Sequence, residues 1–208
     1  MFAKCIDTMG NDLTIVNAAR VSFGKRKKEF TEGDEKLINY LAKHNHWSPF
    51  GHGSLQFHIK APIFVARQLV KHQVGLTWNE VSRRYVDDDP EIYEVDKWRG
   101  RPIDKKQGSD GELEKQGLCE NLANVASFHA LNSYKSLLDA GVAPEQARMV
   151  LPQSMMTEWY WSGTLYAFAR ICNLRCKEDA QYETRLIANE MDKQCKEVFP
   201  ISWKALRN

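Results

Sequence analysis

Residues 71–85, KHQVGLTWNEVSRRY, combine side chains that suit the binding of a phosphorylated ligand. The cations of this segment and its upstream neighbour are Arg67, Lys71, Arg83 and Arg84. An arginine presents a planar pair of donors that matches a phosphate, and the hydroxyl of Ser82 can add another. Glu80 would disfavour an anion on its own, so we expect its carboxylate to accept hydrogen bonds or to hold an arginine. The alternative is a solvent-exposed face held by salt bridges.

Three histidines, His44, His46 and His52, lie close together in HNHWSPFGH. A histidine cluster can bind zinc, but no H-E-x-x-H motif or cysteine pair accompanies this one. The imidazoles and Ser48, beside an aromatic-rich turn, suit contacts to a planar or phosphorylated ligand equally well. We expect no metal here and a structural role for at least His44.

Two arginines in the C-terminal half are further candidates, each with a structural alternative. Arg148 follows Glu145 by three positions, a spacing that suits an intrahelical ion pair. Arg175 ends an aromatic segment, where a cation also complements a helix dipole. The residues alone do not choose between these roles and the binding of an anionic ligand.

The hydrophobic pattern predicts the elements that position these side chains. Residues 54–62 alternate as in a half-buried strand, and residues 63–72 have helical spacing, which would place Arg67 and Lys71 on one face. We expect a strand and helical turn over 12–23, and a strand near 92–95 inside a loop or insertion at 86–113. Further helices are expected over 34–44, 114–140, 144–151, 156–175 and 178–197. This order of elements indicates an α+β fold in a single domain, residues 1–208.

Composition limits the classes of protein to consider. The 208 residues carry a net charge of +2 and 43% hydrophobic residues, as in a soluble globular protein. So small a charge does not indicate a nucleic-acid-binding protein. The N-terminus lacks the apolar core of a signal peptide, and no segment is long enough to span a membrane. We therefore expect a cytoplasmic protein.

The five cysteines are odd in number and scattered, which argues against a disulfide framework. Cys172 and Cys176 lie one helical turn apart, a spacing that could suggest a metal. No further cysteine or histidine nearby completes a ligand set, so we expect buried thiols and no metal.

Several of these segments together resemble the flavin-dependent thymidylate synthases. The signature of that family is PIFVARQ, followed by a cationic triplet with a central histidine and by NExSxRY. HWSPFGH, ARMVLP and NLRCKEDAQ also fall in the order and at the distances of the family. The resemblance covers nearly the whole chain and is weakest over 24–34 and 86–140. The Arg-His-Arg triplet of the family reads Lys71-His72-Gln73 here, and one residue is inserted before Asn79.

The resemblance implies that the chain makes dTMP from dUMP. Methylenetetrahydrofolate would supply the one-carbon unit, and FAD, reduced by NADPH, would supply the hydride. The implied fold has a central, largely antiparallel sheet flanked by long helices. It would assemble as a homotetramer with active sites at subunit interfaces.

The resemblance also assigns site residues. Those implied in dUMP binding are Gln68, Lys71, Glu80, Ser82, Arg83, Arg84, Arg148 and Arg175. Those implied in FAD binding are His46, Ser48, Lys71, His72, Gln73 and Glu80. Arg175 would stabilise negative charge as N3 of the uracil loses its proton. Arg83 would act through its backbone, and Arg148 would reach a dUMP whose other phosphate ligands belong to a neighbouring subunit. Ser82 lacks a histidine–acid partner in the pattern, which favours phosphate binding over attack.

Two other functions remain compatible with the residues. The basic segment could belong to a non-enzymatic RNA- or phosphate-binding module, which would be colourless and would bind more weakly as salt increases. The altered triplet could instead mark a flavoprotein without synthase activity. An absorbance spectrum, followed by a tritium-release assay with labelled dUMP, would separate the three.

Overall fold

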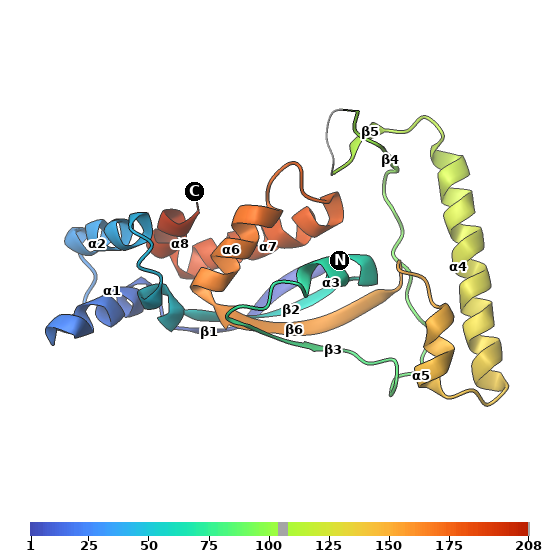
Figure 1. Cartoon of the computed structure of the whole chain (residues 1–208), viewed down its shortest axis with the longest axis horizontal. Coiled ribbons are helices and arrows are strands. Elements are labelled where there is room, and N and C mark those ends of the chain that lie inside the picture. Colours follow the sequence, from blue (N-terminus) through green and yellow to red (C-terminus); the bar gives the residue numbers. More distant parts are fainter. Residues whose placement is uncertain (104–107, 208) are drawn as a thin grey trace.

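A sheet of four antiparallel strands runs through the centre of the molecule, in the order β1-β2-β6-β3 (Figure 1). The computed structural model describes residues 1–103 and 108–207. The strands are β1 (Phe2–Met9), β2 (Ser54–Pro62), β3 (Leu76–Glu80) and β6 (Met156–Thr164). The predicted α+β fold with an antiparallel sheet is confirmed.

The two central strands place large apolar side chains in the core. Leu55, Phe57 and Ile59 alternate along β2 and are at most 2% exposed. On β6, Trp161 lies opposite Phe57 and Trp159 lies opposite Ile59, and both indoles are buried. Side chains that alternate with these face the other side of the sheet. The strand predicted over 54–62 is therefore confirmed.

Helices cover one face and one end of this sheet (Figure 1). Those along the sheet are α3 (Ile63–Leu69), α6 (Leu165–Arg175) and α7 (Tyr182–Val198). Those at the end are α1 (Asp12–Arg20), α2 (Glu32–Lys43) and α8 (Pro200–Leu206), with the short 3₁₀ turns η1 (Val21–Phe23) and η2 (Ser48–His52). Phe168 of α6 meets Phe57 edge-on, with ring centroids 5.0 Å apart. The helices predicted over 34–44, 63–72 and 178–197 are confirmed, although α3 ends at Leu69.

Two predicted elements are wrong. Residues 12–20 are helical because Asn11 caps α1: its side chain accepts from the amide of Thr14 at 3.2 Å. Residues 156–164 form a strand, and the helix begins only at Leu165. Thr164 marks this boundary, since its hydroxyl oxygen accepts from the amide of Ala167 at 3.2 Å and caps α6.

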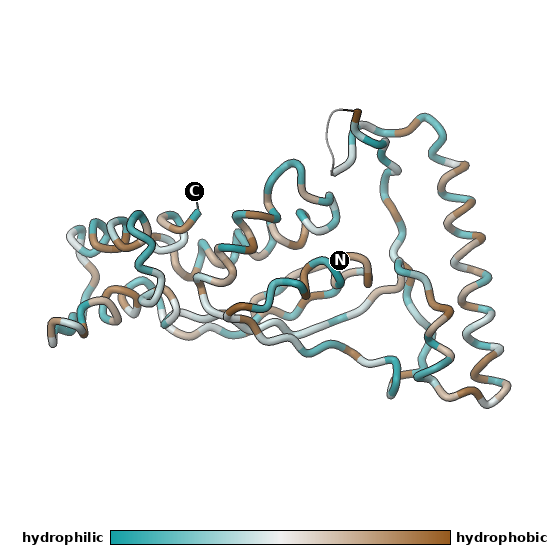
Figure 2. Tube along the Cα trace, in the orientation of Figure 1, coloured by the Kyte–Doolittle hydropathy of each residue, from teal (hydrophilic) through white to brown (hydrophobic). Residues whose placement is uncertain are grey.

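Helix α4 (Gln116–Asp139) stands beyond the end of the sheet, next to α5 (Pro144–Ala147) and η3 (Arg148–Val150) (Figure 1). These elements confirm the helices predicted over 114–140 and 144–151. Tyr134 is the buried residue of α4, while hydrophobic residues recur along the helix (Figure 2). Its exposed row is Leu118, Leu122, Val125 and Phe128, which are 48–63% exposed. Neither α4 nor any other described helix is long and apolar enough to cross a membrane.

The described residues of the segment 86–113 hold little regular structure, as predicted. Its two short strands, β4 (Arg99–Gly100) and β5 (Asp110–Glu112), pair with each other. The strand predicted near 92–95 is reduced to a single bridge between Ile92 and Met155. Part of the predicted loop, residues 104–107, lies outside the described residues.

Candidate active site

The segment 70–75 leaves α3 and turns against the start of α6. Gly75 has a φ of +77°, and a Cβ there would lie 3.3 Å from Cβ of Ala167 and from Oγ1 of Thr164. The carbonyl of Gly75 accepts from the amide of Thr164 at 3.1 Å. A left-handed backbone and this close approach both favour glycine. Because α3 ends at Leu69, Lys71 lies in a turn. It does not lie on the helical face that it was predicted to share with Arg67.

Glu80, the last residue of β3, is held by two protein donors. Thr157 donates its hydroxyl to Oε1 at 2.8 Å, and Trp78 donates Nε1 to Oε2 at 3.1 Å. The expectation that this carboxylate accepts hydrogen bonds is confirmed. Its donors are neutral side chains, so its negative charge is retained at the site.

A turn at residues 82–85 follows β3. The amide of Tyr85 donates to the carbonyl of Ser82 at 3.0 Å, and Nε of Arg84 donates to the Ser82 hydroxyl oxygen at 3.2 Å. Ser82 is half-buried and Arg84 is exposed. The hydroxyl thus faces a guanidinium, a partner that does not activate it for attack.

A cleft of about 690 Å³ opens beside this turn and is named the arginine cleft. The cations that line it are Lys60, Arg67, Arg83 and Arg148, and its carboxylates are Glu80, Asp88, Asp89, Glu91 and Glu158. The Arg83 side chain donates Nη1 to the carbonyl and to Oδ1 of Asp88, at 2.6 and 2.5 Å. Arg83 was expected to act through its backbone, but its side chain also belongs to this cleft.

Arg148 enters the arginine cleft from η3. It is exposed, and its Nε donates to the backbone carbonyl of Glu145 at 3.2 Å, so a backbone contact takes the place of the ion pair considered above. The start of β6 lies beside the chain after β3, since the amide of Val81 donates to the carbonyl of Glu158 at 2.9 Å. Arg148 and Arg83 thus line the same cleft of a single chain, whereas the resemblance assigned Arg148 and the Ser82 segment to different subunits.

A second cleft, of about 640 Å³, contains Gln68 and Arg175 and is named the Arg175 cleft. Nε of Arg175 donates to Nε2 of His72 at 3.1 Å. His72 must then accept through Nε2 and carry its proton on Nδ1. Burial, and then the guanidiniums of Arg175 and Arg170, lower the pKa of His72. The imidazole is therefore neutral near pH 7, as an acceptor must be.

Gln68 brings an unpaired acceptor to the Arg175 cleft. Its Oε1 is buried and has no hydrogen-bond partner among the residues that the structure describes. Leaving a buried polar atom unpaired costs about 1–3 kcal/mol, so a rearrangement that lets Oε1 accept a hydrogen bond would be favoured. On the same cleft, Arg99 forms an ion pair with Glu183 and lies 4.2 Å from the ring centroid of Tyr182.

Two smaller hollows, each of about 110 Å³, lie along α6. The first is lined by Lys71, His72, Gln73 and Arg170, and the second by His46, Trp47, Tyr166 and Arg170. Arg170 is common to both and is exposed. Trp47 is 59% exposed, and its ring lies 6.2 Å from that of Tyr166. Ser48, which begins η2, is exposed and lines neither hollow.

The predicted residues thus form two groups within one chain. Glu80, Ser82, Arg83, Arg84 and Arg148 lie in or next to the arginine cleft. Gln68, Lys71, His72, Gln73 and Arg175 lie around the Arg175 cleft and the adjoining hollow, and His46 lies in the next. Sequence reasoning missed Arg99 and Glu183, because an ion pair between residues 84 positions apart leaves no local signal.

Known proteins resemble this chain over nearly its whole length. The Thymidylate synthase complementing protein family matches residues 4–201. A flavin-dependent thymidylate synthase of Thermus thermophilus is 41% identical over 204 residues, which cover 98% of this chain and 74% of that protein. One of Kosmotoga olearia is 40% identical over 211 residues, which cover 100% of this chain and 90% of that protein.

A solved structure extends the likeness to three dimensions. The UMP/dUMP methylase PolB from Streptomyces cacaoi, bound with 5-Br dUMP, is 30% identical and has a TM-score of 0.88. The match covers 98% of this chain and 93% of that chain. Together with the sequence matches, it shows that this chain belongs to the family of flavin-dependent thymidylate synthases.

Proposed function

We propose that this chain methylates dUMP to dTMP at a site built from the arginine cleft and the Arg175 cleft. The cofactor of its family is FAD, with NADPH and methylenetetrahydrofolate as co-substrates. The folate supplies the carbon, and FAD reduced by NADPH supplies the hydride. All of these ligands are small molecules of central metabolism, so the proposed setting is the cytoplasm.

The arginine cleft and the turn at 82–85 are assigned to the phosphate and sugar of dUMP. Arg148, held only by the backbone carbonyl of Glu145 among its described hydrogen bonds, keeps its charge for an anion. Arg84 and Ser82 add a second guanidinium and a hydroxyl beside the cleft. Glu80 has lone pairs beyond those that its two donors use, and it can accept from a sugar hydroxyl.

Arg175 is assigned to the uracil ring. Because Nε is engaged by His72, the other guanidinium donors are available to a ligand in the Arg175 cleft. A guanidinium beside the uracil stabilises the negative charge that develops when N3 loses its proton. Gln68 lines the same cleft and is assigned to the same ligand.

The residues that line the two hollows have the chemistry needed to bind flavin adenine dinucleotide. Its diphosphate needs cations, and Lys71 and Arg170 are exposed there. Its planar ring systems can stack on aromatic side chains, and Trp47 and Tyr166 offer such faces. Arg170 lines the same hollow as Gln73 and supplies the cation that the glutamine lacks. The residues assigned to FAD are His46, Ser48, Lys71, His72, Gln73 and Glu80, of which Ser48 and Glu80 lie outside the two hollows.

Each complete site is proposed to be shared between subunits of a homotetramer. The arginine cleft and the Arg175 cleft of one chain have no lining residue in common. One dUMP would then use the arginine cleft of one subunit and the Arg175 cleft of another. The exposed row on α4 supports contact between subunits, since large apolar patches usually mark interfaces. The division of the predicted dUMP ligands between two clefts that share no lining residue is the observation that carries the proposal.

Two measurements on the purified chain test the function. We expect the absorbance of a bound flavin, and release of tritium from dUMP labelled at C5 that requires methylenetetrahydrofolate and NADPH. Arg175→Ala is the matched control, which should keep the flavin and lose the release. A colourless protein, or a flavoprotein that releases no tritium, would contradict the proposed activity.

A further inference from the structure

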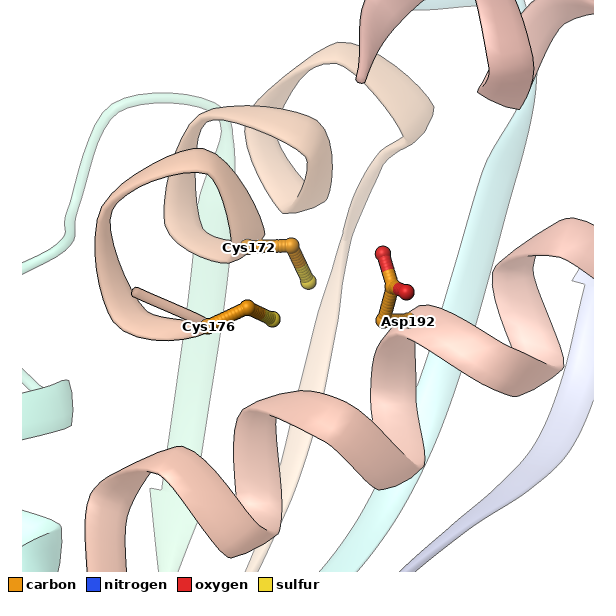
Figure 3. Close-up of side chains that lie close together, drawn as sticks. All are labelled: Cys172, Cys176 and Asp192. Atoms are coloured by element: carbon orange, nitrogen blue, oxygen red, sulfur yellow. The ribbon is translucent and has the colours of Figure 1, made fainter. Parts of the chain in front are cut away.

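Two thiols and a carboxylate meet between α6 and α7. Cys172 lies on α6, Cys176 is the residue that ends it, and Asp192 comes from α7. Their ligand atoms all lie within 4.8 Å of one another. Figure 3 shows the three side chains pointing toward one another across the space between the two helices.

We propose that Cys172, Cys176 and Asp192 bind a thiophilic divalent cation such as Zn²⁺. Thiolates and a carboxylate are ligand types that zinc accepts, with bonds of about 2.0–2.3 Å. Tetrahedral ligands at such lengths are about 3.3–3.8 Å apart, so a pair at the 4.8 Å limit would have to close by about 1 Å. The spacing of the cysteines alone could not include the third ligand, because only the packing of α7 on α6 brings Asp192 to them.

The charges around the cluster suit such an ion. Oδ1 of Asp192 accepts from Nε of Arg207 at 2.6 Å and from Nε1 of Trp203 at 3.0 Å, which leaves Oδ2 to the ion. Binding releases a proton from each thiol, since thiolates are the ligands. The two thiolates and the carboxylate are then balanced by the divalent ion and the Arg207 guanidinium. The site stays neutral overall, which avoids the cost of burying net charge.

The surroundings hold these ligands in place before an ion binds. Arg207 also donates to Oδ1 of Asn173, and Nδ2 of Asn173 donates to the carbonyl of Leu206 at 2.8 Å. Such outer contacts orient metal ligands and tune their affinity. Cys172 is buried, whereas Cys176 and Asp192 are half-buried, so an ion can enter from the surface and keep a water as its fourth ligand.

Titration of the purified full-length chain with Cd²⁺ tests the site, because cadmium thiolates have an ultraviolet charge-transfer band. We expect a single ion per chain and release of one proton from each thiol. Cys172→Ser and Cys176→Ser should each weaken binding by more than about 100-fold, since loss of an outer partner alone costs about 10- to 100-fold. Cys119→Ser, on α4, is the matched control and should bind like the unmodified chain.

Three results would overturn the proposal. The first is no charge-transfer band at one equivalent of Cd²⁺, and the second is an equal loss in Cys119→Ser. Asp192→Asn keeps an oxygen acceptor for Arg207 and Trp203 and removes the charged ligand, so unchanged affinity in this variant would be the third.

Melting temperature provides a second readout if Cys172→Ser does not fold. Zn²⁺ should raise the melting temperature of the unmodified chain, as any ligand of the folded state does. Cys176→Ser changes a half-buried atom, and its fold can be checked by circular dichroism. An equal Zn²⁺-dependent rise in this variant would contradict the assigned site.

Discussion

Arg175 and His72 are joined by a hydrogen bond of 3.1 Å from Nε to Nε2, across 103 positions of the sequence. The bond fixes the guanidinium assigned to uracil against an imidazole of the altered triplet, which is assigned to FAD. It requires a neutral imidazole, and the lowered pKa of His72 meets this requirement. The assignment of Arg175 to uracil and that of His72 to FAD therefore both depend on this hydrogen-bonded pair.

Replacing Arg175 by alanine should leave FAD bound and lower the turnover of dUMP by about two to three orders of magnitude, the effect of losing one preorganised donor. Steady-state assays at saturating dUMP, with the flavin spectrum recorded in parallel, measure both properties. Arg175→Lys keeps a charge but loses the planar fork, and it should recover only part of the loss. Normal turnover in Arg175→Ala would reduce the residue to a helix-capping cation.

The acid limb of the pH profile should depend on His72. Because burial and two guanidiniums lower its pKa, the neutral form persists to lower pH than for an ordinary imidazole. Activity should thus hold through the usual histidine range and fall only when His72 gains a proton and ceases to accept from Arg175. His72→Gln keeps an acceptor that does not titrate and should remove this fall in kcat/KM, whereas His72→Phe should be impaired at every pH. An unchanged acid limb in His72→Gln would assign it to another group.

Lys71→Arg restores one residue of the family signature and should give near-normal or better activity. The cation is kept, and the exposed turn at 70–75 leaves room for a planar fork. Lys71→Ala should weaken both dUMP and FAD, as measured by their separate dissociation constants. An inactive but folded Lys71→Arg would show that the inserted residue has redirected this turn.

Ser82→Ala should weaken dUMP binding by about 1–2 kcal/mol, the scale of one hydrogen bond to a charged group. The hydroxyl already contacts Arg84, so the variant also removes a positioning contact for that guanidinium. Turnover at saturating dUMP should persist. Complete loss there, with a covalent adduct visible by mass spectrometry in the unmodified protein, would instead indicate a nucleophilic serine.

Much of the fold could be predicted where one face of an element is apolar. The alternation of Leu55, Phe57 and Ile59 correctly indicated β2. The strand β6 was missed because it pairs with β2 on one side and β3 on the other and is aromatic in both phases. Trp159 and Trp161 are buried, while Tyr160 between them is 51% exposed. Three consecutive aromatic residues hide the period of two, and α6 follows this strand directly.

The individual residues of the candidate site could be predicted, but not which of them lie together in the structure. Family motifs indicated Arg148 and Arg175, yet no spacing could show that Arg148 joins Arg83 while Arg175 joins His72. Such contacts depend on how distant segments pack. For the same reason, Asp192 could not be linked in advance to Cys172 and Cys176.

The most direct test of the account is whether two defective chains can repair each other. One chain carries Arg84→Ala with Arg148→Ala, in and beside the arginine cleft, and the other carries Arg175→Ala. If sites are shared between subunits, random mixing should leave about a quarter of the sites with every wild-type ligand. As a control, co-expressed Arg84→Ala and Arg148→Ala chains should show no such repair, because both lesions affect the same cleft.

The measurement is tritium release from labelled dUMP by co-expressed, co-purified chains, with mixing proved by two affinity tags and assembly checked by size-exclusion chromatography. The account predicts recovery of about a quarter of wild-type activity in a single tetrameric species. No recovery despite proven mixing would contradict it, since the arginine cleft and the Arg175 cleft would then serve one nucleotide within the same subunit.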